Sequence, residues 1–407
     1  MEKGKTYSFN SKKDYVEYNS AIIQAERKRH QKKQKVTYYT VNVEFYPYNK
    51  KYYLIIPKRY LDNIKYLRRN KNDIFAKGKI LTFTLNSNSK RPFSFDAVVD
   101  RSEKDPKNSL IVYAYFFPIK EKYRYSNELV GNYTVKERSG DLTYQRMDEA
   151  LDEFSNGDCC SENLEKYILG QDIPYQKYFN DIFNYWRYYP SSIYNYFTLN
   201  NYEYNKINKI FYNQMNTVLI KSKTNYKVIC LMIYAIYQMR KNIHDKILIC
   251  SSSNNSADTI ALELFRMRKF VKKLNLLRIY AKNQEIIKRH EFLDYISYHK
   301  LLMKAQNRNN FFGGRNLLIE KNDIIISTCV NSHCDEMINY EFPFVIIVDA
   351  NNSNENENLI PITLKAKHLV LIAIEEDNED QDKEENNENI NLYKRMKHLY
   401  PNNHIEI

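Results

Sequence analysis

The sequence predicts an α/β protein in two unlike parts, a small antiparallel β-barrel followed by a parallel sheet covered by helices. In the first part, short runs of alternating apolar and polar residues follow one another with no helix between them. From about residue 199 onward, continuous apolar runs alternate with long helical stretches. That second pattern is typical of parallel strands buried on both faces. At 407 residues, 43% of them hydrophobic, the chain is long enough for two to three domains with real cores.

The first element is a helix. Residues 12–35 are polar, lack Gly and Pro, and predict one exposed helix within a segment assigned to residues 1–35. An apolar stripe at helical spacing is expected along it. Its members are Tyr15, Tyr18, Ile22 and Ala25.

The barrel is predicted from five short strands separated by turn-like polar clusters. Strands at this spacing indicate a small antiparallel barrel of roughly 100 residues, which we assign to residues 36–138. The predicted strands are 37–46, 51–57, 79–85, 93–100 and 109–117.

Residues 139–198 form the next predicted segment, a second helix at 143–155 and a Tyr-rich linker. The single Trp, Trp186, lies in that linker. Packing between helix and sheet is the expected role of Trp186, and stacking on RNA is the alternative.

The parallel sheet is assigned to residues 199–407. Helices are expected at 256–274 and 390–400, and an acidic, solvated loop at 375–389. The predicted strands are 217–220, 246–250, 276–280, 323–328, 344–349 and 368–374.

Charge and composition indicate the class of partner. The formal net charge of +13 with many aromatic residues favours a polyanion, nucleic acid first, although a coding bias toward Lys would also produce it. The sequence has no apolar run near 18 residues and no apolar signal core at its start, so no membrane contact is expected. Six Cys without framework spacing favour a reducing compartment, the cytoplasm or the nucleus.

Polar residues follow the apolar strands, and in open α/β sheets function gathers at the carboxyl ends of strands. Asp349 ends an apolar run, which is typical of a strand end that holds magnesium, although many strands end in Asp for turn reasons. Residues 217–237 have the strand, turn and helix layout of a phosphate-binding loop, yet the turn contains no Gly.

The order and spacing of these segments resemble the first RecA-like domain of the superfamily 1 helicases, most closely the up-frameshift helicases of nonsense-mediated mRNA decay. The resemblance implies a RecA-like (P-loop NTPase) sheet domain and a small antiparallel β-barrel carried on stalk helices. It also implies that the zinc domain before the stalk and the second RecA-like domain are missing. The matching stretches of the second half include KILICSSSNNSADTIALEL, NDIIISTCVNSHCDE and FPFVIIVDANNSNENENLIPITLKAKHLVLIA, and those of the first half EYNSAIIQAERKRHQKKQ, TVNVEFYPYNKKYYLIIPK and TVKERSGDLTYQRMDEALDEF.

The resemblance also implies that the phosphate-binding loop has lost its chemistry. Residues 222–229 align with the family's eight-residue loop, and every Gly is replaced. Val228 takes the place of the loop Lys, while Lys227 lies one position early. Without Gly, backbone conformations of positive φ become costly.

Other ATP-handling motifs are changed as well. Asp349 matches the magnesium Asp, Ala350 replaces the catalytic Glu, and Glu203 matches an adenine-side Gln. Ala373, Ile374 and Asp377 match the motif that senses the γ-phosphate, which is therefore absent. Losing one transition-state group typically costs factors of hundreds or more, so we expect no ATP hydrolysis and no catalytic residue. No cofactor is expected, and ATP with Mg would be needed only by the alternative given below.

The motifs that contact nucleic acid resemble the family more closely than the ATP-handling motifs do. Ser253 and Asn254 after one strand, and Thr328 and Val330 after another, match residues that contact the strand's backbone. Such side chains suit phosphate and ribose contacts with single-stranded RNA. The alternative is that these polar residues only cap helices, for which Ser256 and Asp258 would suffice. Arg27 and Arg29 could touch nucleic acid or a ribosome, or lie on a merely solvated face.

Cys and His residues offer two smaller hypotheses. Cys329, His333, Cys334 and His299 could suggest zinc, but the strand-end motif already accounts for the region around Cys329. Cys159 and Cys160 are expected to serve packing.

The predicted function is that of a non-catalytic RNA-associated or interaction factor in mRNA surveillance or translation. The expected partners are single-stranded RNA and a protein of RNA surveillance or of the ribosome. One alternative is an ATP-dependent helicase of nonsense-mediated decay completed by a second RecA-like domain on another chain. Another is a decaying gene product that has kept only a scaffold role.

Overall fold

The computed structural model divides into two compact units, each described here by itself. The sheet unit comprises Met1–Gln24, Thr143–Tyr280 and Arg289–Ile407, and the barrel unit comprises Ala25–Leu142 and Ala281–Lys288. The residues that the structure describes are 7–33, 39–48, 51–56, 80–85, 94–104, 110–116, 131–137, 141–171, 217–223, 226–239, 244–269, 274–281, 284–285, 289–307, 314–375, 391–401 and 404–406.

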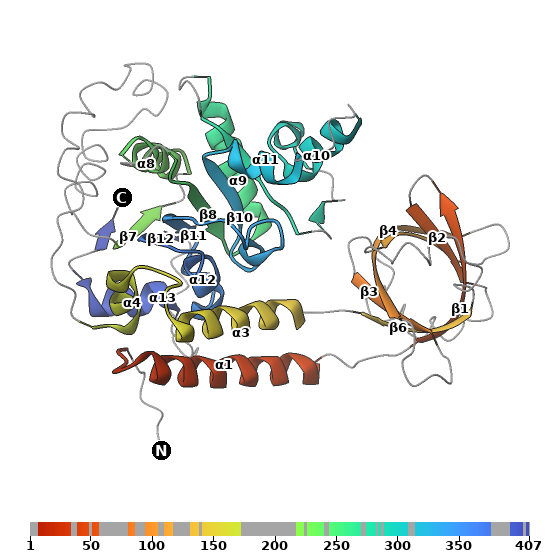
Figure 1. Cartoon of the computed structure of the whole chain (residues 1–407), viewed down its shortest axis with the longest axis horizontal. Helices are drawn as coiled ribbons and strands as arrows, with labels where there is room; N and C mark the ends of the chain where they lie inside the picture. The colour runs from red at the N-terminus through yellow and green to blue at the C-terminus, as the bar shows by residue number, and fades with distance from the viewer. Residues whose placement is uncertain are drawn as a thin grey trace. The chain divides into compact units, whose positions relative to one another are not determined.

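The barrel unit contains a closed antiparallel barrel of strand order β1-β2-β5-β4-β3-β6 (Figure 1). The predicted antiparallel barrel is thereby confirmed. Alternate residues point inward, so that Leu81, Phe83, Tyr133 and Val135 are fully buried. The strands are β1 (Tyr39–Tyr48), β2 (Lys51–Ile56), β3 (Ile80–Leu85), β4 (Ser94–Lys104), β5 (Leu110–Phe116) and β6 (Gly131–Glu137).

The sixth strand, β6, closes this barrel because it pairs with both β1 and β3. The alternation pattern alone predicts five strands, and β6 is not among them. A closed barrel leaves no strand edge among these six strands, so β6 supplies the pairing that five strands would lack.

The sheet unit contains a parallel sheet of seven strands in the order β13-β7-β12-β11-β8-β10-β9. Every pair is parallel, and β12 lies between β7 and β11, so the predicted RecA-like sheet is confirmed. The edge strand β13 was not predicted from the sequence. The strands are β7 (Thr217–Lys223), β8 (Ile247–Ser251), β9 (Leu276–Arg278), β10 (Ile324–Thr328), β11 (Phe344–Val348), β12 (His368–Glu375) and β13 (His404–Glu406).

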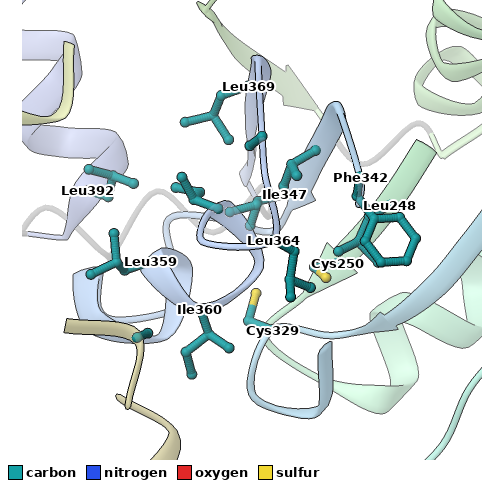
Figure 2. Close-up of a cluster of buried hydrophobic side chains, with 14 of the residues drawn as sticks. Leu248, Cys250, Cys329, Phe342, Ile347, Leu359, Ile360, Leu364, Leu369 and Leu392 are labelled. Atoms are coloured by element: carbon teal, nitrogen blue, oxygen red, sulfur yellow. The ribbon is translucent and has the colours of Figure 1, made fainter. Parts of the chain in front are cut away.

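Helices cover both faces of this sheet. Ile247 and Ile249 of β8 face one apolar cluster, which includes residues of α8 (Tyr226–Met239) and α9 (Asn254–Met267). Leu248 and Cys250 face the other cluster, part of which Figure 2 shows. The helices that contribute to this second cluster include α1 (Lys12–Lys33), α3 (Asp141–Asn156), α4 (Glu162–Leu169), α12 (Glu355–Ile362) and α13 (Leu392–Leu399). Because each strand is buried on both sides, its sequence reads as one continuous apolar run.

The buried face of α1 differs from the predicted stripe. Tyr15 is fully buried as predicted, but Tyr18 is 41% exposed and Ala25 is exposed. The buried positions are instead Tyr15, Asn19 and Ile23, which are four residues apart. Asn19 is tolerated there because its side-chain amide donates to the carbonyl of Tyr15 at 3.0 Å, so its polar group is not left unpaired.

Some sequence-based predictions lie outside the described residues. Among them are Glu203, Trp186, Asp377 and most of the acidic loop. Within the part of the chain that the structure describes, no helix is long and apolar enough to cross a membrane.

Candidate functional site at the carboxyl edge of the sheet

The strand register places the predicted site residues along one edge of the sheet. Val348 of β11 lies beside Ser251 of β8, and Ser251 lies beside Thr328 of β10. The segments that follow these three strands hold Asp349, Ser253 and Asn254, and Val330, so the structure gathers them on neighbouring strands. Lys227 follows β7, which β12 separates from β11.

Asp349 sits directly after β11 in the left-handed backbone region, with φ of 64°. Asp is one of the few residues that adopt this region readily. Its carboxylate accepts hydrogen bonds from the Ser252 hydroxyl at 2.9 Å and from the Asn352 side-chain amide at 2.7 Å. Asp349 is half-buried, and carboxylate oxygens are the ligands that magnesium prefers. The magnesium role of Asp349 stays a prediction.

Only two residues separate β7 from α8. The predicted strand ended at Ile220, but β7 continues to Lys223, which pairs with Glu375 of β12. Helix α8 begins at Tyr226. A phosphate cradle needs backbone amides that are free to turn toward the ligand, whereas Ser222 and Lys223 lie in the ladder with β12.

Two of the residues aligned with the phosphate-binding loop have buried side chains. Ser222 and Val228 are each only 1% exposed, and Val228 belongs to an apolar cluster of the sheet unit. Lys227 is exposed on the first turn of α8.

Apolar side chains occupy the other positions that would handle ATP. Ala350, which replaces the catalytic Glu, is fully buried, and its amide donates to the carbonyl of Ile372 at 2.9 Å. Ala373 and Ile374 are 4% and 6% exposed and also belong to the core. None of these three side chains can position a water molecule or bind a phosphate.

Ser253 and Asn254 are engaged within the protein. The Ser253 hydroxyl caps α9 by accepting from the amide of Ser256 at 3.2 Å. The residue that caps this helix is therefore Ser253 itself, and not Ser256 or Asp258, which the sequence offered as caps. The Asn254 side-chain oxygen accepts from the guanidinium of Arg278 at 2.9 Å. Direct nucleic-acid contact by these two side chains would have to compete with these bonds.

Arg278 is a buried organising residue that sequence reasoning missed. Its side chain is fully buried, and its Nε donates to Asp258 at 2.9 Å. The other Asp258 oxygen accepts a hydrogen bond from Arg289 at 2.9 Å. The hydroxyl of Tyr280 also donates to Asp258, and burial raises the pKa of Tyr280. The sequence signal that could have revealed Arg278 was a single charged residue inside the apolar run LLRIY. A buried charge of this kind requires a paired partner.

The second predicted nucleic-acid pair lies after β10. Thr328 is half-buried at the end of the strand. Val330 begins the short 3-10 helix η5 (Val330–His333), and its carbonyl accepts from Arg146 of α3 at 2.8 Å. Of the four predicted contact residues, Thr328 is best placed to present a hydroxyl at the edge.

The Cys and His residues are placed for packing and ion pairing. His333 lies between Glu149 and Glu153 of α3, at 3.2 Å and 3.1 Å. Burial raises the pKa of the Cys334 thiol to about 12. All six cysteines are free, Cys159 and Cys160 included. Within the described ranges, no group of three or more His, Cys, Asp or Glu side chains is arranged to hold a metal ion.

Comparison with known proteins supports the class of the sheet unit. Residues 297–372 match a family model described as an AAA domain, a segment that includes Thr328, Val330 and Asp349. This segment of the sheet unit is thus similar to that family. No curated protein matches the chain.

One of the similar solved structures is that of RecG bound to a three-way DNA junction. It shares 10% sequence identity with a TM-score of 0.25, and the similarity covers 82% of this chain and 48% of that one. The chain thus spans about half the length of that protein.

Proposed function

We propose that this chain is an up-frameshift-like member of the superfamily 1 helicases that does not hydrolyse ATP by itself. Its role is that of a non-catalytic, RNA-associated or interaction factor in mRNA surveillance or translation, in the cytoplasm or nucleus. Single-stranded RNA is the proposed nucleic-acid partner, together with a protein of RNA surveillance or the ribosome.

The short connection between β7 and α8 is the observation that carries this proposal. Of the eight aligned residues, Ser222 and Lys223 lie in the ladder of β7 with β12, and residues 226–229 form the first turn of α8. The buried Ala350 removes the carboxylate that would position water. Phosphoryl transfer depends almost entirely on positioning and charge stabilisation, so losing these groups together is expected to abolish it.

The RNA association rests on the edge geometry and on charge. Thr328 lies at the carboxyl edge, and the chain carries a net charge of +13. Contacts of this kind supply affinity without sequence choice.

Isothermal titration with ATP–Mg, and separately with a short single-stranded RNA at low salt, tests both halves of the proposal. We expect no heat from ATP–Mg, and weak RNA binding that falls steeply as salt is raised. RNA-stimulated ATP hydrolysis that disappears in Asp349→Ala would contradict the proposal, and absence of RNA binding at low salt would contradict its RNA half.

A second candidate function is a working RNA helicase completed by a RecA-like domain on another chain. The observation that favours it is Asp349, which is kept at the strand end and held by Ser252 and Asn352. Only in this case would ATP and Mg be cofactors. Co-purification of such a chain, with ATP hydrolysis that needs both proteins, would support this alternative.

A further inference from the structure

An exposed cluster of aromatic side chains lies on the sheet unit. Seven large apolar side chains are exposed in the described residues, and two of them lie together here. They are Phe292 and Tyr295 of the 3-10 helix η4 (Glu291–Tyr295), at 38% and 60% exposure. The ring of Phe265 of α9 stacks with both. We call these three residues the aromatic platform.

The rings of the platform lie nearly parallel. The ring centroids of Phe265 and Phe292 are 5.8 Å apart with an interplanar angle of 29°. Those of Phe265 and Tyr295 are 6.1 Å apart at 18°. Phe265 therefore contacts both exposed rings in a near-parallel arrangement, which suits a stacking surface.

Cations flank the same rings. The guanidinium of Arg268 lies 5.5 Å from the Phe265 centroid, and the ammonium of Lys304 lies 5.3 Å from that of Tyr295. Aromatic rings alternating with Arg and Lys are typical of surfaces that bind single-stranded nucleic acid, because bases stack on the rings and phosphates meet the cations. Glu291 and Asp294 lie in the same 3-10 helix, so base stacking should contribute more to affinity here than net charge.

The platform is separate from the carboxyl edge. Helix α9 begins after Ser253 at that edge and ends at Met267, and Phe265 lies in its last turn. A helix of 14 residues spans about 21 Å. One strand of RNA at the edge and one base stack at the platform would thus be distinct contacts.

We propose that the aromatic platform binds unpaired bases of single-stranded RNA, with Tyr295 and Phe292 as the stacking rings and Lys304 and Arg268 contacting phosphates. The proposal takes its ligand class from the proposed function above, but it adds a second contact surface that the superfamily motifs do not include.

The full chain carrying Tyr295→Ala, and separately Phe292→Ala, tests this proposal by fluorescence anisotropy at low salt. The probes are a labelled oligouridine and an abasic oligomer of equal length and charge. We expect each variant to weaken oligouridine binding by at least about fivefold and to leave abasic binding unchanged, because only bases can stack. Tyr295→Phe, which keeps the ring, should bind like the wild type.

Tyr18→Ala is the matched control, since Tyr18 is an exposed aromatic residue of α1 outside the platform. Circular dichroism verifies that each variant is folded. If Tyr295→Ala and Phe292→Ala both bind oligouridine like the wild type while Thr328→Ala binds it less well, the platform proposal is overturned and the proposed function stands. If the wild type binds neither probe, the RNA association itself fails.

Discussion

His333 is held between two carboxylates of α3, so the protonation of one residue affects the stability of the sheet unit. Its ring nitrogens lie 3.2 Å and 3.1 Å from Glu149 and Glu153. Since carboxylates only accept hydrogen bonds, both nitrogens can donate only when the ring is protonated. The hydrogen bond to Glu153 accordingly raises the pKa of His333. Burial acts to raise the pKa of Glu153, but its hydrogen bonds with His333 and Thr363 bring it below the ordinary value.

The contribution of His333 to stability should therefore depend on pH. A raised folded-state pKa means that the contribution is complete below about pH 6.5 and is lost as pH rises through the raised value. The lowered pKa of Glu153 keeps its carboxylate charged in mildly acidic solution. We expect His333→Gln to lower the urea midpoint more at pH 5.5 than at pH 9, as measured by circular dichroism.

His398→Gln serves as the control for this measurement, because the His398 ring stacks on Tyr7 at 4.0 Å. Its effect on the urea midpoint is measured over the same pH range for comparison. A difference between wild type and His333→Gln that widens toward alkaline pH would contradict the expectation.

At the scale of elements, α8 shows why restoring one motif residue would not restore a nucleotide site. Val228 lies in the first turn of α8 with 1% exposure, among apolar residues of α8 and the sheet. The position that would carry the loop Lys has become part of the core.

Val228→Lys should therefore destabilise the protein without conferring ATP binding. Burying an ammonium group in this cluster costs on the order of several kcal/mol, or forces the Lys to lose its proton. Val228→Leu, which remains apolar, is the control and should cost much less. Urea unfolding and titration with ATP–Mg measure the two effects. A stable Val228→Lys protein that binds ATP–Mg would show that the loop is still functional.

At the scale of the whole sheet unit, a buried ion pair joins segments that are far apart in the sequence. Arg395 of α13 is 2% exposed and contacts Glu355 of α12 through two hydrogen bonds, of 3.0 Å and 2.6 Å. Its remaining donors reach the carbonyls of Tyr7, at 2.8 Å, and Ile168, at 2.7 Å. One guanidinium therefore connects the segment before α1 with α4, α12 and α13, and no charge in the pair is left without a partner.

Arg395→Met should lower the free energy of unfolding by about 3–5 kcal/mol, because it leaves Glu355 as an uncompensated buried charge. The double variant Arg395→Met with Glu355→Leu should lose less than the single variant, since it removes both charges. The control is Lys166→Met, which breaks the exposed Lys166–Glu162 pair and should cost much less than Arg395→Met. Urea unfolding provides the comparison, and a loss in Arg395→Met no larger than in Lys166→Met would refute this role.

The sequence by itself determined the class of fold and the residue types of the loop aligned with the phosphate-binding motif. Continuous apolar runs such as FVIIV arise when a strand is buried on both faces, so they identify β11 and its neighbours without any structure. The absence of Gly from the turn after β7 is likewise a property of the sequence alone. Six of the seven strands of the sheet were found in this way.

Only the tertiary structure decided which side chains are free to act. Periodicity reports local burial, but hydrogen-bond partners come from distant segments, as for Ser253 at its cap and for Asn254 on Arg278. The extension of β7 to Lys223 depends on pairing with β12, which lies about 150 residues later in the chain. The aromatic platform is likewise assembled from α9 and η4, with Lys304 of α10 beside it, and no single stretch of sequence contains it. Partners such as these are fixed by contacts between elements, which is why local sequence patterns could not predict them.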